Sequence, residues 1–356
     1  MAYLCRTMSP GFGRPSAGDC LVLVDVIMLA VSLGLILLAS VLFTNAIEIL
    51  GHRLKFHQAA VGGILAAVGT ALPETVIPII AILVYRGDPD AQQVGIGAIA
   101  GAPFMLATLA MFVTGVAVVV YTLLGKRKLA MKAAPRQLGL DLTFFVAIYG
   151  TAVLVTFIHD AIVVKTVIAV GLLLAYVFYV RKTLATESDA MEECELLLVG
   201  RLLRVRTSLP LVLGQVVASV VLMIASAHLF VGYVETVATG LGVPALILSI
   251  IITPVATELP EKFNSVIWVG KKKDILAMGN ITGAMVFQSS FPVVFGILFT
   301  EWDLRGPTIV SAVLALASSV LLLVWVKIRK SLNPFILMVG GLLYAVFIGY
   351  LVWAMR

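Results

Sequence analysis

Long apolar runs, each sufficient to cross a lipid bilayer, recur along the whole sequence and constrain its fold more than any other feature. A spanning helix needs about 20 apolar residues. Only 12% of the residues are charged, whereas a soluble domain carries about 25%, so too little polar material remains to cover a soluble surface. Continuous runs also differ from the alternating pattern of barrel strands. The sequence therefore predicts an all-α integral membrane protein with about ten spans: 21–48, 59–85, 93–124, 141–158, 161–180, 208–232, 244–269, 275–300, 307–327 and 334–355.

The basic residues divide unevenly between the two sides that these spans define. Eighteen of the 25 Lys and Arg fall in connections that follow odd-numbered spans, and six fall on the other side. The excess of Lys and Arg marks the cytoplasmic side. We therefore expect a multi-pass protein of the cell membrane with both termini outside. The net charge of +6 is explained by this topology, so we expect the lipid bilayer, and not nucleic acid, as a partner.

Two short motifs occur twice in the sequence. The pattern Thr-x-Leu-Pro-Glu occupies Thr70–Glu74 in the second span and Thr257–Glu261 in the seventh. Downstream, Gly97–Ala102 in the third span matches Gly279–Ala284 in the eighth at four of six positions. The copies are five spans apart, and an odd number of spans inverts the second copy in the membrane. Inverted repeats of this kind are typical of secondary transporters with a site near the midplane.

The repeat divides the chain into four predicted regions. Residues 1–20 form an N-terminal tail, 21–180 the first five-helix repeat, 181–207 a cytoplasmic loop, and 208–356 the second five-helix repeat. The loop carries a cluster of acidic residues, which is typical of a solvated segment. Three cysteines without metal-ligand spacing indicate neither a disulfide framework nor a zinc site.

Each Thr-x-Leu-Pro-Glu motif places a proline inside an apolar span. Proline removes a backbone donor and interrupts a helix, so we expect broken helices at spans 2 and 7, buried in protein or lining a polar cavity. Glu74 and Glu261 follow their prolines and are predicted in the first turn of a second half-helix, where the helix dipole favours an anion. A charged side chain near the bilayer centre costs about 2.5–3.5 kcal/mol and is normally functional. The alternative is a protonated glutamate that closes a helix–helix hydrogen bond.

The two glycine pairs, Gly97/Gly101 and Gly279/Gly283, have the spacing that lets helices approach closely. We expect them to bring spans 3 and 8 close to spans 2 and 7. Pro103 in the third span also predicts an irregular backbone there.

Both Thr-x-Leu-Pro-Glu motifs, each followed in the next span by Gly-x-x-x-Gly and a small residue, resemble the two alpha-repeats of the sodium/calcium exchanger family, within the cation/calcium antiporter superfamily. The internal match also extends upstream without a gap, from Leu42 and Phe43 to Leu229 and Phe230. The resemblance implies alternating access, with calcium and a driving ion competing for one cluster of oxygens between the repeats. It identifies the chain as a divergent member, a transporter and not an enzyme, with no cofactor.

The chain departs from the family pattern at several oxygen-bearing positions. Ala71 and Glu258 replace the serine that usually follows the motif threonine. Ala102 and Ala284 replace serines after the second glycine, and Ala98 replaces the first asparagine. Leu106 and Gln288 stand where the family carries Asn or Asp. These changes remove several expected sodium ligands, and they favour proton coupling.

The resemblance and the repeat together predict the site. Glu74 and Glu261 bind the transported cation, Thr70 and Thr257 contribute oxygens at the helix breaks, and Glu258, Asn280 and Gln288 assist from the second repeat. Calcium is the expected substrate because a hard divalent ion suits oxygen ligands, exchanged for sodium or protons. Proton-coupled exchange of another divalent cation such as magnesium or manganese, and a non-exchanging channel-like descendant, remain alternatives.

Glu258 lies four residues before Lys262 in the same span. This order is the better one for a helical ion pair, and pairing would leave Glu74 and Glu261 as the two titrating carboxylates. In the alternative, Glu258 is a third ligand or a proton carrier, and Lys262 extends toward water.

Overall fold

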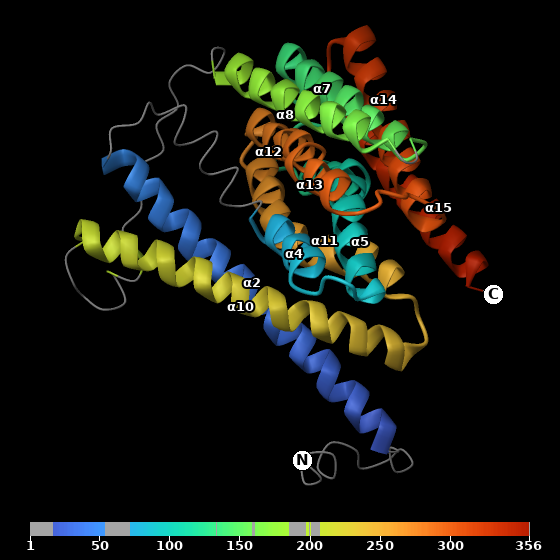
Figure 1. Ribbon diagram of the computed structural model, residues 1–356. Coiled ribbons are helices and arrows are strands. Elements are labelled where there is room, and N and C mark those ends of the chain that lie inside the picture. Colours follow the sequence, from blue (N-terminus) through green and yellow to red (C-terminus); the bar gives the residue numbers. More distant parts are fainter. Residues whose placement is uncertain are drawn as a thin grey trace, which may run out of the picture.

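The computed structural model describes residues 17–53, 72–132, 134–158, 161–184, 197–198, 200 and 207–355. Among their helices, the side chains at 17–23, 48, 51–53, 72, 184, 256 and 259–264 fall outside the description. The described chain is built from helices joined by short connections (Figure 1). They are α2 (Ala17–Arg53), α4 (Leu72–Leu83), α5 (Pro89–Met105), the π-helix η2 (Leu106–Ala110), α6 (Met111–Leu123), α7 (Pro135–Val155), α8 (Ile162–Leu184), α10 (Leu209–Leu241), α11 (Ala245–Gly270), α12 (Asp274–Gln288), α13 (Phe291–Phe299), α14 (Pro307–Arg329) and α15 (Pro334–Ala354).

Every predicted span overlaps one of these helices or a consecutive set of them. Eight described segments are long and apolar enough to cross a membrane. Two shorter apolar stretches, Pro73–Leu83 in α4 and Ala245–Val255 in α11, fall in the second and seventh predicted spans. The first part of the second span, residues 59–71, lies outside the described residues. The predicted multi-pass, all-helical architecture is confirmed.

The helices form two groups in space. Figure 1 shows α2 and α10 crossing the molecule together, set apart from the other helices, and the two pack along each other. Helices α4, α5, α11, α12 and α13 form the centre, and α7, α8, α14 and α15 lie beyond it, on the side away from α2 and α10. The largest cluster of buried apolar side chains runs through the centre and this outer group.

The helix contacts repeat when the first five spans are exchanged with the last five. The second part of span 3, α6, packs on α15, and the second part of span 8, α13, packs on α8. In the same way α14 packs on α5 as α7 packs on α12, and α10 packs on α4 as α2 packs on α11. Equivalent helices therefore make equivalent contacts, as expected for two intertwined repeats.

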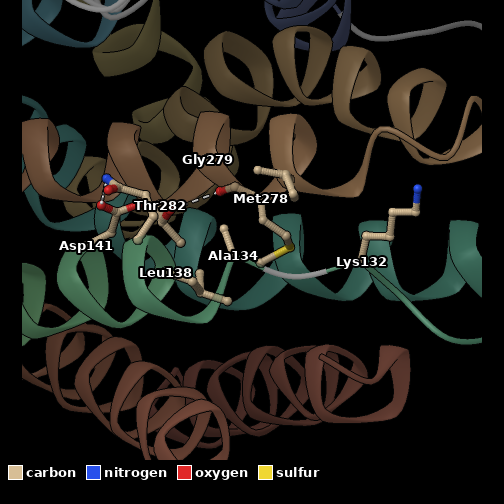
Figure 2. Close-up of a pocket in the computed structure, with 9 residues that line it drawn as sticks. Lys132, Ala134, Leu138, Asp141, Met278, Gly279 and Thr282 are labelled. Atoms are coloured by element: carbon tan, nitrogen blue, oxygen red, sulfur yellow. Dashed lines mark hydrogen bonds between the residues drawn. The ribbon is translucent and has the colours of Figure 1, made fainter. Parts of the chain in front are cut away.

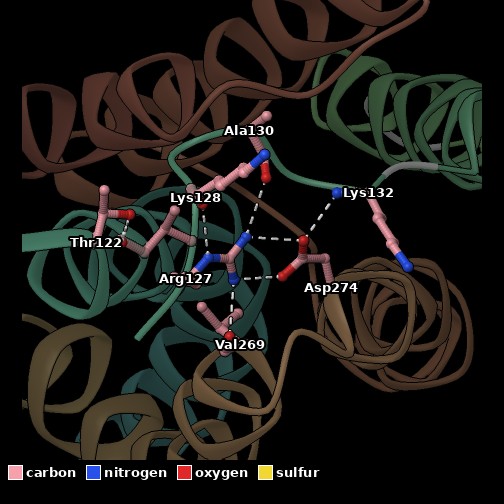
Figure 3. Close-up of polar contacts among 8 residues, drawn as sticks. Thr122, Arg127, Lys128, Ala130, Lys132, Val269 and Asp274 are labelled. Carbon is pink, nitrogen blue, oxygen red and sulfur yellow. Dashed lines mark hydrogen bonds and ion pairs between the residues drawn. The ribbon is translucent and has the colours of Figure 1, made fainter. Parts of the chain in front are cut away.

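Connections assigned to the same side of the membrane contact each other. On the side rich in basic residues, Arg127 after α6 forms an ion pair with Asp274 at the start of α12 (Figure 3), and Met131 forms a β-bridge with Leu332. On the other side, Lys165 Nζ donates a hydrogen bond to the carbonyl oxygen of Glu301 (2.8 Å). These contacts agree with the alternation of sides in a ten-span chain.

The structure differs from the predicted helix break in span 7. Helix α11 is continuous from Ala245 to Gly270 and includes both Pro254 and Pro260. Each proline removes one hydrogen bond from the ladder, and local adjustment with packing by neighbouring helices lets a membrane helix continue through it. In span 2 the residues before Leu72 are not described, so the predicted break there stays a prediction.

Interruptions lie instead at matching positions of spans 3 and 8. The π-helix η2 begins at Leu106, three residues after Pro103, which confirms the irregular backbone predicted there. In span 8, Ser289 and Ser290 separate α12 from α13. The offset of 182 residues that relates Gly97 to Gly279 also relates Leu106 to Gln288. A π-helical turn such as η2 shifts the backbone hydrogen bonds from i→i+4 to i→i+5, and turns of this kind often mark a functional site.

The first glycine pair lets α5 pack closely on α11. A Cβ atom added to Gly97 would lie 2.9 Å from the carbonyl oxygen of Leu246, and one added to Gly101 would lie 2.5 Å from that of Ile250. Both distances are too short for a side chain, so glycine is required there. The expected approach of span 3 to span 7 is confirmed. At Gly279 and Gly283, an added Cβ would meet no described atom within 4 Å.

Part of the predicted loop 181–207 is packed against the helices. Helix α8 continues to Leu184, and Leu197 is fully buried in a small cluster with Ala46 and Val212. The backbone N–H of Leu198 donates to Asn45 Oδ1 (2.9 Å). These residues anchor the end of the connection to α2 and α10, while the acidic cluster that was predicted as a solvated segment lies outside the described residues.

Candidate functional site

Glu74 lies in α4, two residues after Leu72, where the described part of this span begins. Its side chain is buried, with 2% of its surface exposed, and the adjacent Thr75 is also buried. Helix α4 contacts α5, α10, α11 and α13, so this carboxyl group is enclosed by helices of both repeats.

Glu258 and Gln288 are brought together from α11 and the end of α12. Gln288 Nε2 donates a hydrogen bond to Glu258 Oε1 (3.2 Å), and only 2% and 1% of their surfaces are exposed. The amide nitrogen of Gln288 faces the carboxylate, while its carbonyl oxygen is of the type that a hard cation prefers. Two of the predicted ligands therefore form one buried group.

A row of buried hydroxyl groups on α11 leads to this pair. Ser249 Oγ lies 3.3 Å from Thr253 Oγ1 and donates to the carbonyl oxygen of Val94 (2.7 Å). One turn later, Thr257 Oγ1 donates to the carbonyl oxygen of Thr253 (2.8 Å), and Thr257 is fully buried beside Glu258. The sequence signal for this row is the spacing of four residues between Ser249, Thr253 and Thr257 in an apolar span. The sequence analysis identified only Thr257.

Asn280 lies away from the Glu258–Gln288 pair. Its Nδ2 atom donates to Ser265 Oγ (3.4 Å), and the residue is half-buried. Eight residues separate Asn280 from Gln288 on α12, which corresponds to roughly 12 Å along a helix. Of the predicted assisting residues, the structure thus unites Glu258 and Gln288, and it gives Asn280 a different partner.

The remaining predicted residues fall outside what the structure describes. Thr70 is not covered, and the side chains of Glu261 and Lys262 are not described, although both belong to α11. Their roles stay predictions, as does the Glu258–Lys262 pair.

Two serines at the interruption of span 8 were missed by the sequence reasoning. Ser289 and Ser290 directly follow Gln288 and are fully buried. Their hydroxyl groups donate to the carbonyl oxygens of Val286 (2.9 Å) and Phe287 (2.8 Å). Two hydroxyl residues before a Phe-Pro step in an apolar run are the signal that identifies this interruption.

The Glu258–Gln288 contact leads to a prediction for cation affinity. Replacing Gln288 with Met keeps the approximate volume but removes a predicted oxygen ligand and the hydrogen-bond donor to the buried Glu258 carboxylate. A hydrogen bond to a charged group contributes about 1.5–3 kcal/mol, so we expect divalent-cation binding to weaken by roughly 10- to 100-fold. Isotopic calcium binding to the purified protein measures the change.

Gln215→Met is the matched control for this variant. Gln215 is buried in α10 and donates to the carbonyl oxygen of Leu42 (2.8 Å), away from the Glu258 pair. The Gln215→Met variant should bind divalent cations with unchanged affinity. Equal affinity in the Gln288→Met variant and the unmodified protein would remove Gln288 from the site.

Comparison with known proteins places this architecture in a family. A family model described as sodium/calcium exchanger protein matches residues 24–183 and 211–356. The chain is 31% identical over 136 residues to CaxA of Alkalimonas amylolytica, which is named as a candidate antiporter. That alignment covers 38% of this chain and 42% of CaxA, less than half of either protein.

Solved structures have a similar fold at low sequence identity. The H+/Ca2+ exchanger CAX matches with a TM-score of 0.68 and 15% identity, over 93% of this chain and 86% of CAX. Native YfkE matches with a TM-score of 0.66 and 14% identity, over 93% and 92%. The sodium-calcium exchanger NCX_Mj matches with a TM-score of 0.58 and 17% identity, over 92% and 99%. Since the family model covers both motif copies and nearly all described helices, the chain belongs to the sodium/calcium exchanger protein family.

Proposed function

We propose that this protein is a secondary active antiporter that exchanges a divalent cation, calcium in the first place, for protons by alternating access. The observation that carries the proposal is the burial of glutamates from the two matching motifs within a membrane-spanning core. Glu74 and Glu258 are each 2% exposed, on helices that contact each other. Names of the related proteins, which include H+/Ca2+ and sodium-calcium exchangers, support the same class.

The charge of the site explains why exchange results. Ionised glutamates that are sealed from water without counter-charge are costly. A divalent cation, or two monovalent cations or protons, offsets the two negative charges of Glu74 and Glu261, while the predicted pairing with Lys262 offsets that of Glu258. The carrier therefore changes sides readily when loaded and slowly when empty, and movement of one ion depends on return of the other. Calcium suits the carboxylate, amide and hydroxyl oxygens of Glu74, Glu258, Gln288 and Thr257; Glu261 and Thr70 complete the proposed set.

The side chains of span 3 favour protons over sodium as the driving ion. Ala102 and Leu106 occupy positions where a sodium ligand is expected, and both are buried and apolar. The third span therefore provides no side-chain oxygen at either position. A proton needs only the glutamates themselves, whereas sodium needs several oxygens around it.

Calcium uptake into proteoliposomes tests the proposed coupling. We expect an imposed pH gradient to drive uptake and an imposed sodium gradient at constant pH to drive little. Empty liposomes and protein without either gradient are the controls, and replacement of calcium by magnesium or manganese defines the substrate. Uptake driven by sodium and insensitive to pH would reject proton coupling, and rapid uptake without any counter-ion gradient would indicate a channel.

We further propose that the protein resides in the cell membrane with both termini outside and with repeats 21–180 and 208–356 joined by a cytoplasmic segment. The excess of basic residues on one side supports this orientation. Inorganic cations and the bilayer are the proposed partners.

A further inference from the structure

A further buried carboxyl group, apart from the proposed transport site, lies in the outer part of the helix bundle. Asp141 in α7 is 2% exposed. Its Oδ1 atom accepts hydrogen bonds from Gln137 Nε2 (2.8 Å) and from the Tyr179 hydroxyl on α8 (3.1 Å). Its Oδ2 atom lies 2.6 Å from Thr282 Oγ1 on α12. Three helices therefore meet at one acidic side chain that the proposed transport site does not use.

The contact with Thr282 can stabilise either protonation state of Asp141. Thr282 Oγ1 also lies 3.0 Å from the carbonyl oxygen of Met278, yet a hydroxyl group has one proton to donate. When Asp141 is ionised, Thr282 donates to the carboxylate. When Asp141 is protonated, its Oδ2–H donates to Thr282, and the Thr282 proton turns to Met278. Neither state leaves a polar atom at this contact without a partner.

A pocket connects Asp141 to the side rich in basic residues. Its buried floor consists of Leu138, Asp141, Met278 and Thr282, and exposed Lys132 and Gly279 line its opening. Figure 2 shows Asp141 and Thr282 at one end of the lining residues and Lys132 at the other, with α7 and α12 as the walls. The pocket has a volume of about 20 Å³, which is space for about one water molecule beside the carboxyl group.

Few other described titratable or charged groups are placed to affect Asp141. On α8 these are Tyr176, Tyr179 and the exposed Arg181 and Lys182. On α12, Asp274 is already paired with Arg127. Helix α13 carries no titratable residue, and those of α14 are at its basic end: Lys327 and Arg329. On α7 itself, Arg136 is exposed and Tyr149 is buried.

We propose that Asp141 is a proton-binding site, separate from the transport glutamates, that exchanges protons with the basic side through this pocket. The ligand is a proton and not a metal ion, because Gln137, Tyr179 and Thr282 present hydrogen-bond donors, whereas a metal ion requires oxygen lone pairs. Ionised Asp141 holds α12 through a charge-assisted hydrogen bond, which is stronger than a neutral one. Protonation weakens this link between α7 and the helix that carries Gln288.

The assignment of the proton site does not require transport, while the effect on α12 rests on the proposed function. Infrared difference spectra of the purified protein between high and low pH test the assignment directly. We expect a carboxylic-acid C=O band to form on acidification and to be missing in Asp141→Asn, which has the shape and hydrogen bonding of the protonated acid. In Thr282→Val, which lacks the charge-assisted donor, the band should form at a higher pH.

Thr143→Val is the matched control, because Thr143 is an exposed residue of α7 whose hydroxyl donates to the Gly139 carbonyl oxygen. It should leave the band unchanged. An identical titration in the unmodified protein and Asp141→Asn would overturn the proposal, since Asp141 would then stay in one state. If Asp141→Asn fails to fold, an unshifted band in Thr282→Val has the same consequence. If the band is lost in Asp141→Asn but the unmodified protein exchanges no calcium, the transport function is rejected and the proton site is kept.

Discussion

Calcium exchange is expected to fall by more than about 100-fold when either Glu74 or Glu261 is replaced with Gln. Changes in groups that merely orient a metal ligand already cost 10- to 100-fold in affinity, and these variants remove a proposed ligand charge itself. Glutamine keeps the size and polarity of the side chain, so the helices should still assemble. Flux into proteoliposomes and the elution profile of each purified variant measure function and folding separately.

Glu301→Gln is the control for loss of one acidic charge, because Glu301 is exposed in the connection after α13. Its exchange rate should match that of the unmodified protein. Normal exchange by Glu74→Gln would instead favour the alternative that this glutamate is a protonated structural group.

Replacing Arg127 with Met should cost about 3–5 kcal/mol of stability, because it leaves the buried Asp274 charge without its partner. Arg127 Nη1 and Nη2 lie 2.6 and 2.9 Å from the two Asp274 carboxylate oxygens. Arg127 also donates to the Val269 carbonyl oxygen (2.7 Å), and the Lys132 backbone N–H donates to Asp274 (2.8 Å). Figure 3 shows these bonds joining the α6–α7 connection to the start of α12.

The midpoint of thermal unfolding in detergent reports this loss. The exposed pair Arg305–Asp303, with its nitrogen and oxygen atoms 2.8 Å apart, provides the matched control. Arg305→Met should cost no more than about 1 kcal/mol because water already solvates both charges. Adding Asp274→Leu to Arg127→Met should recover part of the stability. A double variant less stable than Arg127→Met would show that the buried ion pair is not the source of the loss.

Apolar length and the repeat made most of the architecture predictable from the sequence. A membrane span is recognised by local composition, because every stretch of backbone in the bilayer must satisfy its own hydrogen bonds and present apolar side chains. The predicted interruption at Pro260 failed because proline determines only the loss of one donor, while neighbouring helices decide whether the ladder continues.

The burial of Asp141 was not predicted from the sequence. The predicted fourth span began at residue 141, so this aspartate was placed at a membrane boundary. Helix α7 begins six residues earlier, at Pro135. Hydropathy alone marks the apolar part of a helix and underestimates its length when polar side chains are buried against other helices.

Arg127 was counted in the sequence as one of several basic residues on the cytoplasmic side, and its burial depended on a partner 147 positions away. The sequence by itself determined the class of protein, the spans, the inverted repeat and the presence of glutamates within two of the spans. Apolar length and motif spacing are properties of short segments, so they can be recognised without the tertiary structure. Only the tertiary structure decided which polar groups face each other, as in Glu258–Gln288, Asp141–Thr282 and Arg127–Asp274. Those partners lie on different helices, and the bundle's packing sets their distances, which no local pattern encodes.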